Sequence, residues 1–499
     1  MFLLFCKIYF YNYKSKNIIS MKNAFKRSFS FLFILFAQTN FIKAFKGSSL
    51  FLISIFFVAC QHDDGTIPPG EDLMNGFWLV ADKGWIFEFT DDKDIFYNVN
   101  TTGCSIQDDD FNLEDFYGFK VDLVNENELV ITSELSDSEV ICTRLSDQNP
   151  YCLPDQIAAT EDPKVNFDHF WNIFNDYYAF FEARNIDWAQ YENLRDQVTE
   201  DNLYDTLEEL VLLLEDEHVG IFDEENDIQI ESGYIKLLER LNANLSGDLI
   251  LENIDDYDTL VNQKVTTIIT KYLERNFEID EKQNILWGLI NDNIGYILIS
   301  TMEGYGTNFS NELTTLNEVL DRMMNDLEAS GVSKLIIDIR FNGGGYDTVA
   351  LNMASRFMDQ ERISYFKKAR LGNDFTENKS FSVEPRGDFQ FTEDIILLTS
   401  PYTISAAELF ALCVKDLPYV TLVGENTSGA FSTILTHVLP NEAVIGLSNE
   451  IYSDAQGEVF EIVGIGPENQ ENQVPFLSSL DFQEGKDSGV ERALELLND

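Results

Sequence analysis

One stretch of the sequence, residues 334–354, joins a buried strand, a run of three glycines and the start of a helix. Its letters are KLIIDIRFNGGGYDTVALNMA. The Leu-Ile-Ile run is typical of a strand that is buried on both faces. Gly343, Gly344 and Gly345 follow it, and glycine lets the backbone approach a bound group closely and present bare N–H groups to it. Such a unit indicates an α/β fold.

The triple glycine can serve three purposes. It can hold a phosphate, it can receive the oxygen of a carbonyl under attack, or it can be a tight turn without chemistry. The loop fits neither phosphate fingerprint, because it lacks the GxGxxG spacing and a Lys-Ser/Thr pair after the glycines. The local sequence leaves the carbonyl oxygen and the plain turn open.

Strands and helices alternate around this stretch, and alternation is typical of a mostly parallel sheet with helices on its faces. The expected strands are Asn293–Ser300, Lys334–Ile339, Asp394–Thr399 and Val420–Val423. The expected helices are Phe309–Ser330, Val349–Met358 and Ile404–Val414. We assign residues 291–499 to this α/β core.

The 499 residues are too many for one compact core, and they divide by pattern into several regions. Residues 73–153 show short alternating strands and predict a small β domain that resembles lipocalin-like modules. Residues 160–222 carry aromatic residues at helical spacing and predict a helical subdomain with an aromatic core. Residues 223–290 form an intermediate segment that lacks a PDZ-type carboxylate-binding loop.

The charge of the chain limits its partners. The formal net charge is −52, from 86 acidic and 34 basic residues. Such a surface repels nucleic acid and anionic lipid, so we expect no nucleic-acid partner. The Cys/His spacing indicates no zinc site, and we expect no metal and no cofactor.

The first 60 residues contain basic residues, no acidic residue, and two apolar runs, of which the second ends in Phe57-Val58-Ala59-Cys60. This pattern indicates an export signal, and the Cys resembles the lipobox of bacterial lipoproteins. The resemblance implies lipidation at Cys60, a linker over residues 61–72, and an outer-membrane lipoprotein of the cell envelope that is periplasmic or surface-exposed. The alternative is a single uncleaved membrane helix.

The remaining cysteines are compatible with export. Cys104, Cys142 and Cys152 lie close together in the sequence, so an oxidising compartment allows one disulfide among the three, with the pairing open. Cys413 lies in an apolar helical run and is expected to be a buried thiol.

Ser405 is the candidate nucleophile. It lies at the start of a helix that leaves the buried strand ending at Thr399. Free N–H groups and the helix dipole favour an oxyanion there. The competing interpretation is a simple N-cap serine.

Five motifs in order resemble peptidase family S41, which includes the C-terminal processing (tail-specific) peptidases and the tricorn core peptidases. They are LEDEHVG, LIIDIRFNGGG, ILLTSPYTISAAELFALCVKD, TLVGENTSGAF and EIVGIGPE. The resemblance covers about residues 165 to 499. It implies a ClpP/crotonase-like α/β core, a serine peptidase activity, and a peptide or unfolded protein as substrate.

The tail-specific branch of the family has a general-base Lys 25 positions after the nucleophile, where this chain has Ala430. Lys415 is too far along the helix from Ser405 to replace it. The tricorn branch uses His instead. Resemblance to that branch implies Ser405 as nucleophile, His218 as general base and Glu461 as the supporting carboxylate.

The same resemblance implies an oxyanion hole made by Gly343 or Gly344 together with Ala406. Glu217 stands where tricorn has Ser, while His169 and His437 are expected to be structural. The rival hypothesis is a catalytically inactive fold of this family that binds a peptide or a small apolar ligand.

Overall fold

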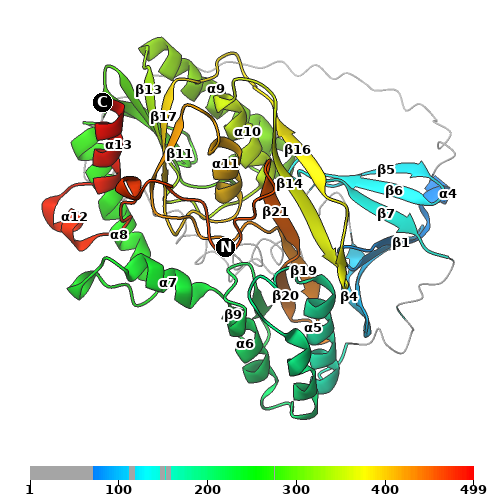
Figure 1. Ribbon diagram of the computed structural model, residues 1–499. Helices are drawn as coiled ribbons and strands as arrows, with labels where there is room; N and C mark the ends of the chain where they lie inside the picture. Colours follow the sequence, from blue (N-terminus) through cyan, green and yellow to red (C-terminus); the bar gives the residue numbers. More distant parts are fainter. Residues whose placement is uncertain (1–70, 112–117, 147–151, 153–158, 275, 499) are drawn as a thin grey trace, which may run out of the picture.

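The computed structural model describes residues 71–111, 118–146, 152, 159–274 and 276–498 (Figure 1). The predicted signal segment with Cys60, and the predicted linker up to residue 70, lie outside these residues. Within the described part, no helix has the length and apolar character needed to cross a membrane.

The N-terminal β domain is one antiparallel sheet of seven strands in the order β4-β3-β2-β1-β7-β6-β5. Trp78, Phe87 and Phe96 are buried in the core of this domain. A disulfide joins Cys104 to Cys152, whereas Cys142 is a free, buried thiol. The elements are α4 (Glu71–Met74), β1 (Gly76–Val80), β2 (Trp85–Phe89), β3 (Asp94–Asn100), β4 (Gly103–Phe111), β5 (Lys120–Asn125), β6 (Glu128–Thr132) and β7 (Val140–Arg144).

A helical layer follows, formed by α5 (Pro163–Tyr177), the 3₁₀ helix η2 (Trp188–Asp196) and α6 (Leu203–Leu213). Asp162 caps α5 by accepting a hydrogen bond from Lys164 N–H, and Pro163 occupies the first helical position. The aromatic residues of α5 pack in the core, as their helical spacing predicts.

A four-stranded sheet joins this helical layer to the end of the chain. Its order is β19-β20-β8-β9, so β8, which begins in the predicted helical subdomain, pairs with β20 of the predicted α/β core. The paired strands β8 and β20 lie more than 200 residues apart in the sequence, so no local pattern predicts that they pair. The strands are β8 (Gly220–Asp223), β9 (Ile228–Glu231), β19 (Ile434–Val438) and β20 (Val444–Ser448).

The α/β core is a six-stranded sheet in the order β10-β11-β12-β13-β17-β18. The last four strands are parallel, as predicted, whereas β10 and β11 are antiparallel additions. The sheet therefore begins at Phe277, earlier than the expected boundary at 291. The strands are β10 (Phe277–Ile279), β11 (Ile285–Asn291), β12 (Ile294–Ile299), β13 (Lys334–Asp338), β17 (Asp394–Thr399) and β18 (Val420–Gly424).

Helices cover both faces of this sheet, which confirms the α/β prediction (Figure 1). One face packs against α9 (Glu312–Ser330), α10 (Asp347–Ala354) and α11 (Ala406–Val414). The other packs against helices of the intermediate segment and of the C-terminus. These are α7 (Tyr234–Asn242), α8 (Ile254–Thr267), the π-helical turn η4 (Ile268–Tyr272) and α13 (Ser488–Asn498), with α12 (Ser479–Glu484) just before the last.

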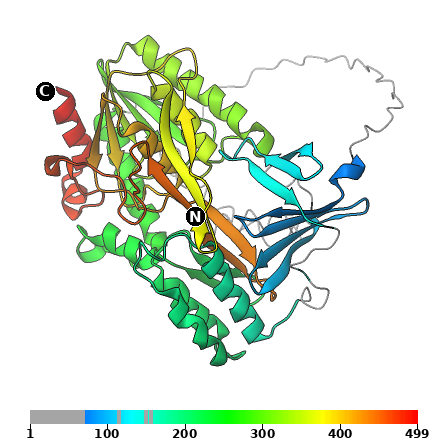
Figure 2. The same cartoon turned by 45° about the vertical axis from the view of Figure 1, so that its right-hand side comes forward.

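The long strand β14 (Arg362–Leu371) connects the core to the N-terminal sheet. It pairs with β21 (Glu450–Asp454), β15 (Asp374–Phe375) and β16 (Lys379–Val383). Figure 2 shows β14 passing between the core and the β domain.

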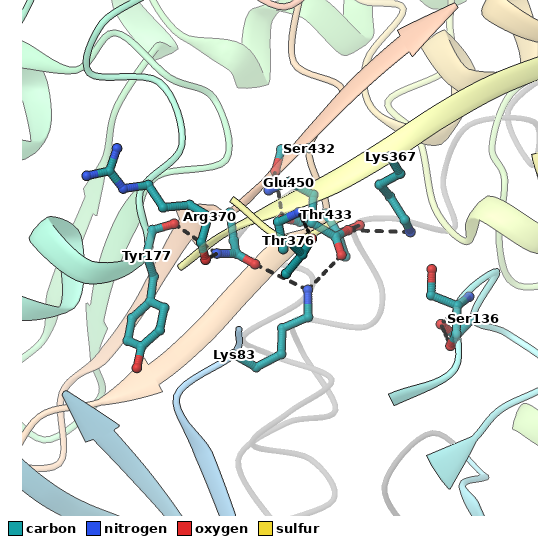
Figure 3. A network of polar contacts seen from close by, with 12 residues as sticks. Lys83, Ser136, Tyr177, Lys367, Arg370, Thr376, Ser432, Thr433 and Glu450 are labelled. Carbon is teal, nitrogen blue, oxygen red and sulfur yellow. Dashed lines mark hydrogen bonds and ion pairs between the residues drawn. The ribbon is translucent and has the colours of Figure 1, made fainter. Parts of the chain in front are cut away.

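Buried charges join the β domain to β14 and to its neighbour β21, and Figure 3 shows Lys83 and Lys367 both directed at Glu450. Lys367 Nζ lies 2.5 Å from Asp137 of the β6–β7 turn, and Lys83 Nζ lies 2.7 Å from Glu450. The N-terminal domain is therefore packed onto the core and not held at a distance from it.

Candidate active site

Ser405 lies on a strained turn between β17 and α11. Its backbone dihedral angles are φ 59° and ψ −125°. A non-glycine residue is rare in this region and costs of the order of 1–3 kcal/mol, so the surrounding structure must hold it there. Strand-to-helix turns of this strained kind expose a nucleophilic serine in hydrolases. The feature is invisible in the sequence, which has no glycine at this point.

The glycine loop lies next to this turn because the ends of β13 and β17 are hydrogen-bonded to each other. Ile404 N–H donates to the Asn342 carbonyl at 3.1 Å, and Ser400 Oγ donates to the Arg340 carbonyl at 2.7 Å. Parallel neighbouring strands bring their carboxyl ends to one edge of the sheet, which is where this fold class places its sites. The topology therefore places the glycine loop beside Ser405, as the sequence predicts.

The N–H groups of the glycine loop are not equivalent. Gly344 N–H donates to Asn342 Oδ1 at 2.9 Å, whereas Gly343 N–H has no acceptor among the described residues. Ala406 is the first residue of α11, so its N–H lies outside the helix ladder. Of the three residues predicted for an oxyanion hole, Gly343 and Ala406 keep N–H groups that a ligand can use.

A cavity of about 950 Å³ opens in front of these groups. Its wall includes Ser405, Tyr402 and the glycines of the loop. On the opposite side it is lined by residues of the N-terminal sheet, among them Leu79, Leu135 and Val140. The sequence assigned that sheet no part in the site, and only the packed structure shows that it closes the cavity.

Glu408 supports the serine turn from within α11. Its side chain is buried and accepts hydrogen bonds from Gly429 N–H at 2.7 Å, Ala430 N–H at 2.8 Å and Ser405 N–H at 3.2 Å. Burial raises the pKa of this carboxyl to about 7, and the hydrogen bonds oppose that shift. Glu408 was not singled out from the sequence, although it lies three positions after Ser405, where an N-terminal carboxylate often caps a helix.

His218 is buried behind the cavity wall. Its backbone N–H donates to Asp216 Oδ1 at 3.0 Å, and Asp216 also accepts from Tyr178 and Ser448 hydroxyls. Neither ring nitrogen of His218 makes a hydrogen bond of ordinary geometry with a described residue, although the Ser432 backbone lies close to the ring, so the imidazole and Ser405 are not hydrogen-bonded in this state. Burial lowers the pKa of His218 to about 4, which keeps the ring neutral and able to accept a proton.

Glu461 reaches the same region from the C-terminal part of the chain. Its Oε2 accepts from Phe431 N–H at 2.8 Å, and its Oε1 lies 3.8 Å from Arg184. Arg184 also lies 3.4 Å from Asp216, the residue that holds the His218 turn. Burial, followed by the negative charge of Asp216, raises the pKa of Glu461 well above its usual range.

These contacts link the segments that carry Ser405, Glu461 and His218. Ser405 is bonded to the Ala430 carbonyl, Glu461 to the next residue, and Arg184 links Glu461 to Asp216. Lys415 is excluded from the site, because it is paired with Asp416 at 2.8 Å and Asp454 at 2.9 Å.

The other histidines make contacts that do not involve the site. His169 Nδ1 meets Asn100 Nδ2 at 3.2 Å, and His437 Nε2 meets the Lys83 carbonyl at 2.7 Å. No cluster of three or more metal-ligating side chains is found in the described part of the chain.

Glu217 is an additional acidic residue of the cavity wall. It accepts a hydrogen bond from the Ser428 hydroxyl, while its buried Oε2 has no partner in the described residues. Burial raises its pKa to about 7. The sequence marks it only as a departure from the tricorn pattern.

The fold and the site belong to an α/β domain, and comparison with known proteins shows which family this domain resembles. The profile of peptidase family S41 matches residues 293–470. The α/β core of this chain is therefore a member of peptidase family S41.

Individual relatives agree with this assignment. The carboxyl-terminal-processing protease of Synechocystis is 26% identical over 35% of this chain and 39% of its own length. The tricorn protease of Thermoplasma acidophilum is 27% identical over 41% of this chain and 16% of its own length. The chain thus spans well under half of these relatives.

A solved structure extends the likeness in fold. A candidate peptidase from Parabacteroides merdae superposes with a TM-score of 0.55 and 23% identity, over 67% of this chain and 96% of its own. At this identity the superposition supports the shared fold alone.

Proposed function

We propose that the chain is a serine endopeptidase that cleaves peptides or unfolded proteins through an acyl-enzyme on Ser405. The observation that carries the proposal is the strained Ser405 turn, which faces a cavity beside the unengaged N–H of Gly343. Membership of the S41 family and the processing proteases among its relatives support a peptide substrate.

In the proposed mechanism, Ser405 Oγ attacks the carbonyl carbon of the scissile bond while His218 takes the hydroxyl proton. The carbonyl oxygen gains negative charge and receives hydrogen bonds from Gly343 N–H and Ala406 N–H. His218 then gives the proton to the leaving amine, and a water molecule, activated by His218 in the same way, releases the acyl group.

His218 suits this role because it is neutral at pH 7, and Glu461 would stabilise the imidazolium that forms once the Glu461 carboxyl has lost its own proton. The imidazole is not bonded to Ser405 in the present state, so substrate binding has to bring the two into contact. Hydrogen bonds between catalytic groups commonly tighten only when substrate is bound.

A fluorophosphonate probe tests the proposal, since it forms a covalent bond with an activated serine. We expect the wild type to be labelled between about pH 6 and 9, and Ser405→Ala or His218→Ala to lose labelling by more than about 10³-fold. Ser478→Ala is the matched control, because Ser478 also precedes a helix but has an ordinary backbone conformation, φ −142°. A folded wild type without labelling would instead favour the inactive, ligand-binding alternative.

We also propose that the protein is lipidated at Cys60 and held in the cell envelope, outer-membrane lipoproteins being the class its first 60 residues resemble. Metabolic labelling with radioactive palmitate, compared with Cys60→Ala, tests this part independently. Incorporation that persists in Cys60→Ala would contradict it.

A further inference from the structure

The cavity in front of Ser405 carries an excess of negative charge. Nine acidic side chains and four lysines line it, in a chain whose formal net charge is −52. Two of the lysines, Lys83 and Lys367, are engaged by Glu450 and Asp137 at 2.7 and 2.5 Å. These two lysines are already paired with carboxylates, so they do not neutralise the remaining acidic side chains. The cavity therefore favours cationic ligands.

Glu303 is an acidic residue of the wall that lies beside the glycine loop. It follows Met302, which forms a parallel β-bridge with Gly345. The approach is close, since a Cβ on Gly345 would lie 2.8 Å from Glu303 N. Glu303 therefore lines the cavity next to the loop that would receive the carbonyl oxygen.

The carboxylate of Glu303 has no hydrogen-bond or ion-pair partner in the part of the chain that the structure describes. The carboxylate of the neighbouring Glu312, in contrast, accepts hydrogen bonds from Tyr305 N–H at 2.9 Å and Gly306 N–H at 2.7 Å. Burial, with a further contribution from Glu312, raises the pKa of Glu303 to about 7. A half-buried carboxylate without a partner is costly, and a cation from a ligand would remove that cost.

We propose that Glu303 forms a specificity subsite that binds a cationic group of the peptide substrate, either a Lys or Arg side chain or a free amino terminus. The proposal rests on the proposed peptidase function and adds to it the charge of the preferred substrate. A charge-assisted hydrogen bond to an ammonium or guanidinium would place the scissile bond relative to Gly343 and Ser405.

Peptide binding to the Ser405→Ala protein tests the subsite without hydrolysis. Fluorescent peptides that are identical except for one Lys, Gln or Glu are compared by anisotropy, each with a free and with an acetylated amino terminus. We expect the Lys peptide to bind about tenfold more tightly than the Gln peptide, with the Glu peptide weakest. If the bound cation is the amino terminus of the peptide, acetylation of that terminus should weaken binding, and replacement of Lys by Gln should not.

Adding Glu303→Gln should reduce the preference for the cation to within about twofold, and Glu303→Asp should restore part of it. Glu377→Gln is the matched control, since Glu377 also lines the cavity but is exposed. The proposal is overturned if cationic and neutral peptides bind equally, if no peptide binds, or if the preference survives Glu303→Gln. Labelling by the fluorophosphonate probe is scored separately, so loss of the subsite and loss of the peptidase function give different results.

Discussion

The backbone N–H of Ser405 donates to the carbonyl of Ala430, 3.0 Å away. Ala430 is the position where the tail-specific branch of the family has its catalytic Lys, so the loop of residues 428–431 here supports the serine without supplying a base. The neighbouring N–H groups of this loop hold Glu408 and Glu461. The proton acceptor has to come from another element, and His218 is our proposal for it.

The strain at Ser405 leads to a prediction about stability. Ser405→Gly should be more stable than Ser405→Ala by about 1 kcal/mol, because glycine adopts φ 59° without the penalty that a Cβ brings. Urea unfolding of the two variants measures the difference, and neither has the nucleophile. If the alanine variant is equally or more stable, the turn stores no strain that matters to the fold.

Glu408 provides a second prediction, because both of its carboxylate oxygens are used. Glu408→Gln places an amide NH₂ against backbone N–H donors of the Gly429–Ala430 loop and leaves at least one without an acceptor. We expect a loss of about 1–3 kcal/mol in unfolding free energy and a fall of about 10- to 100-fold in kcat. Activity unchanged within a factor of two would show that the loop does not position Ser405.

The α/β core was predictable because its signals are local. Buried apolar runs, the glycines and the helix periods are each contained in about ten residues, and β17 occupies Asp394–Thr399 as expected. Ser405 and the glycine loop could be joined because both follow strands of one parallel sheet.

The parts that could not be predicted depend on contacts between distant segments. Pairing of β8 with β20 joins residues more than 200 positions apart, and the N-terminal sheet reaches the cavity only through packing. Glu303 has no motif of its own, and its place beside Gly345 follows from the loop geometry after β12.

A third prediction concerns pH. Burial lowers the pKa of His169 to about 4, so the unfolded chain binds a proton between about pH 6.5 and 4 that the folded protein does not. The neutral His169 therefore makes folding less favourable as the pH falls through this window. His169→Gln lacks this penalty, so the stability gap between wild type and variant should shrink by about 1–2 kcal/mol from pH 7 to pH 5.

Urea unfolding of both proteins at the two pH values measures that gap. Comparing the wild type with His169→Gln isolates the effect of His169. Buried carboxyls with raised pKa values, such as Glu408, make folding more favourable as the pH falls, which is the opposite effect. A gap that is constant or grows towards pH 5 would mean that His169 is protonated in the folded protein.

The last prediction concerns the contact between the β domain and the core. Asp137 accepts hydrogen bonds from Lys367 at 2.5 Å and from Tyr365 at 2.6 Å, and the side chains of the ion pair are 4% and 6% exposed. Asp137→Ala leaves Lys367 with weaker partners, Glu450 at 3.5 Å and the Tyr452 hydroxyl at 3.4 Å, and should cost about 3 kcal/mol. Limited proteolysis should then release the N-terminal sheet faster than in the wild type.

The double variant Asp137→Leu/Lys367→Met separates the loss of the ion pair from the exposure of an unpaired charge. Two apolar side chains fill the space without leaving a buried cation, so most of the lost stability should return. The pair Lys120–Glu134 is the matched surface control, because its side chains are 66% and 55% exposed. Glu134→Ala should change the unfolding free energy by less than about 1 kcal/mol. Equal effects of Asp137→Ala and Glu134→Ala would show that the buried ion pair does not hold the β domain in place. The cavity wall that the β domain provides would then have to be maintained by apolar contacts alone.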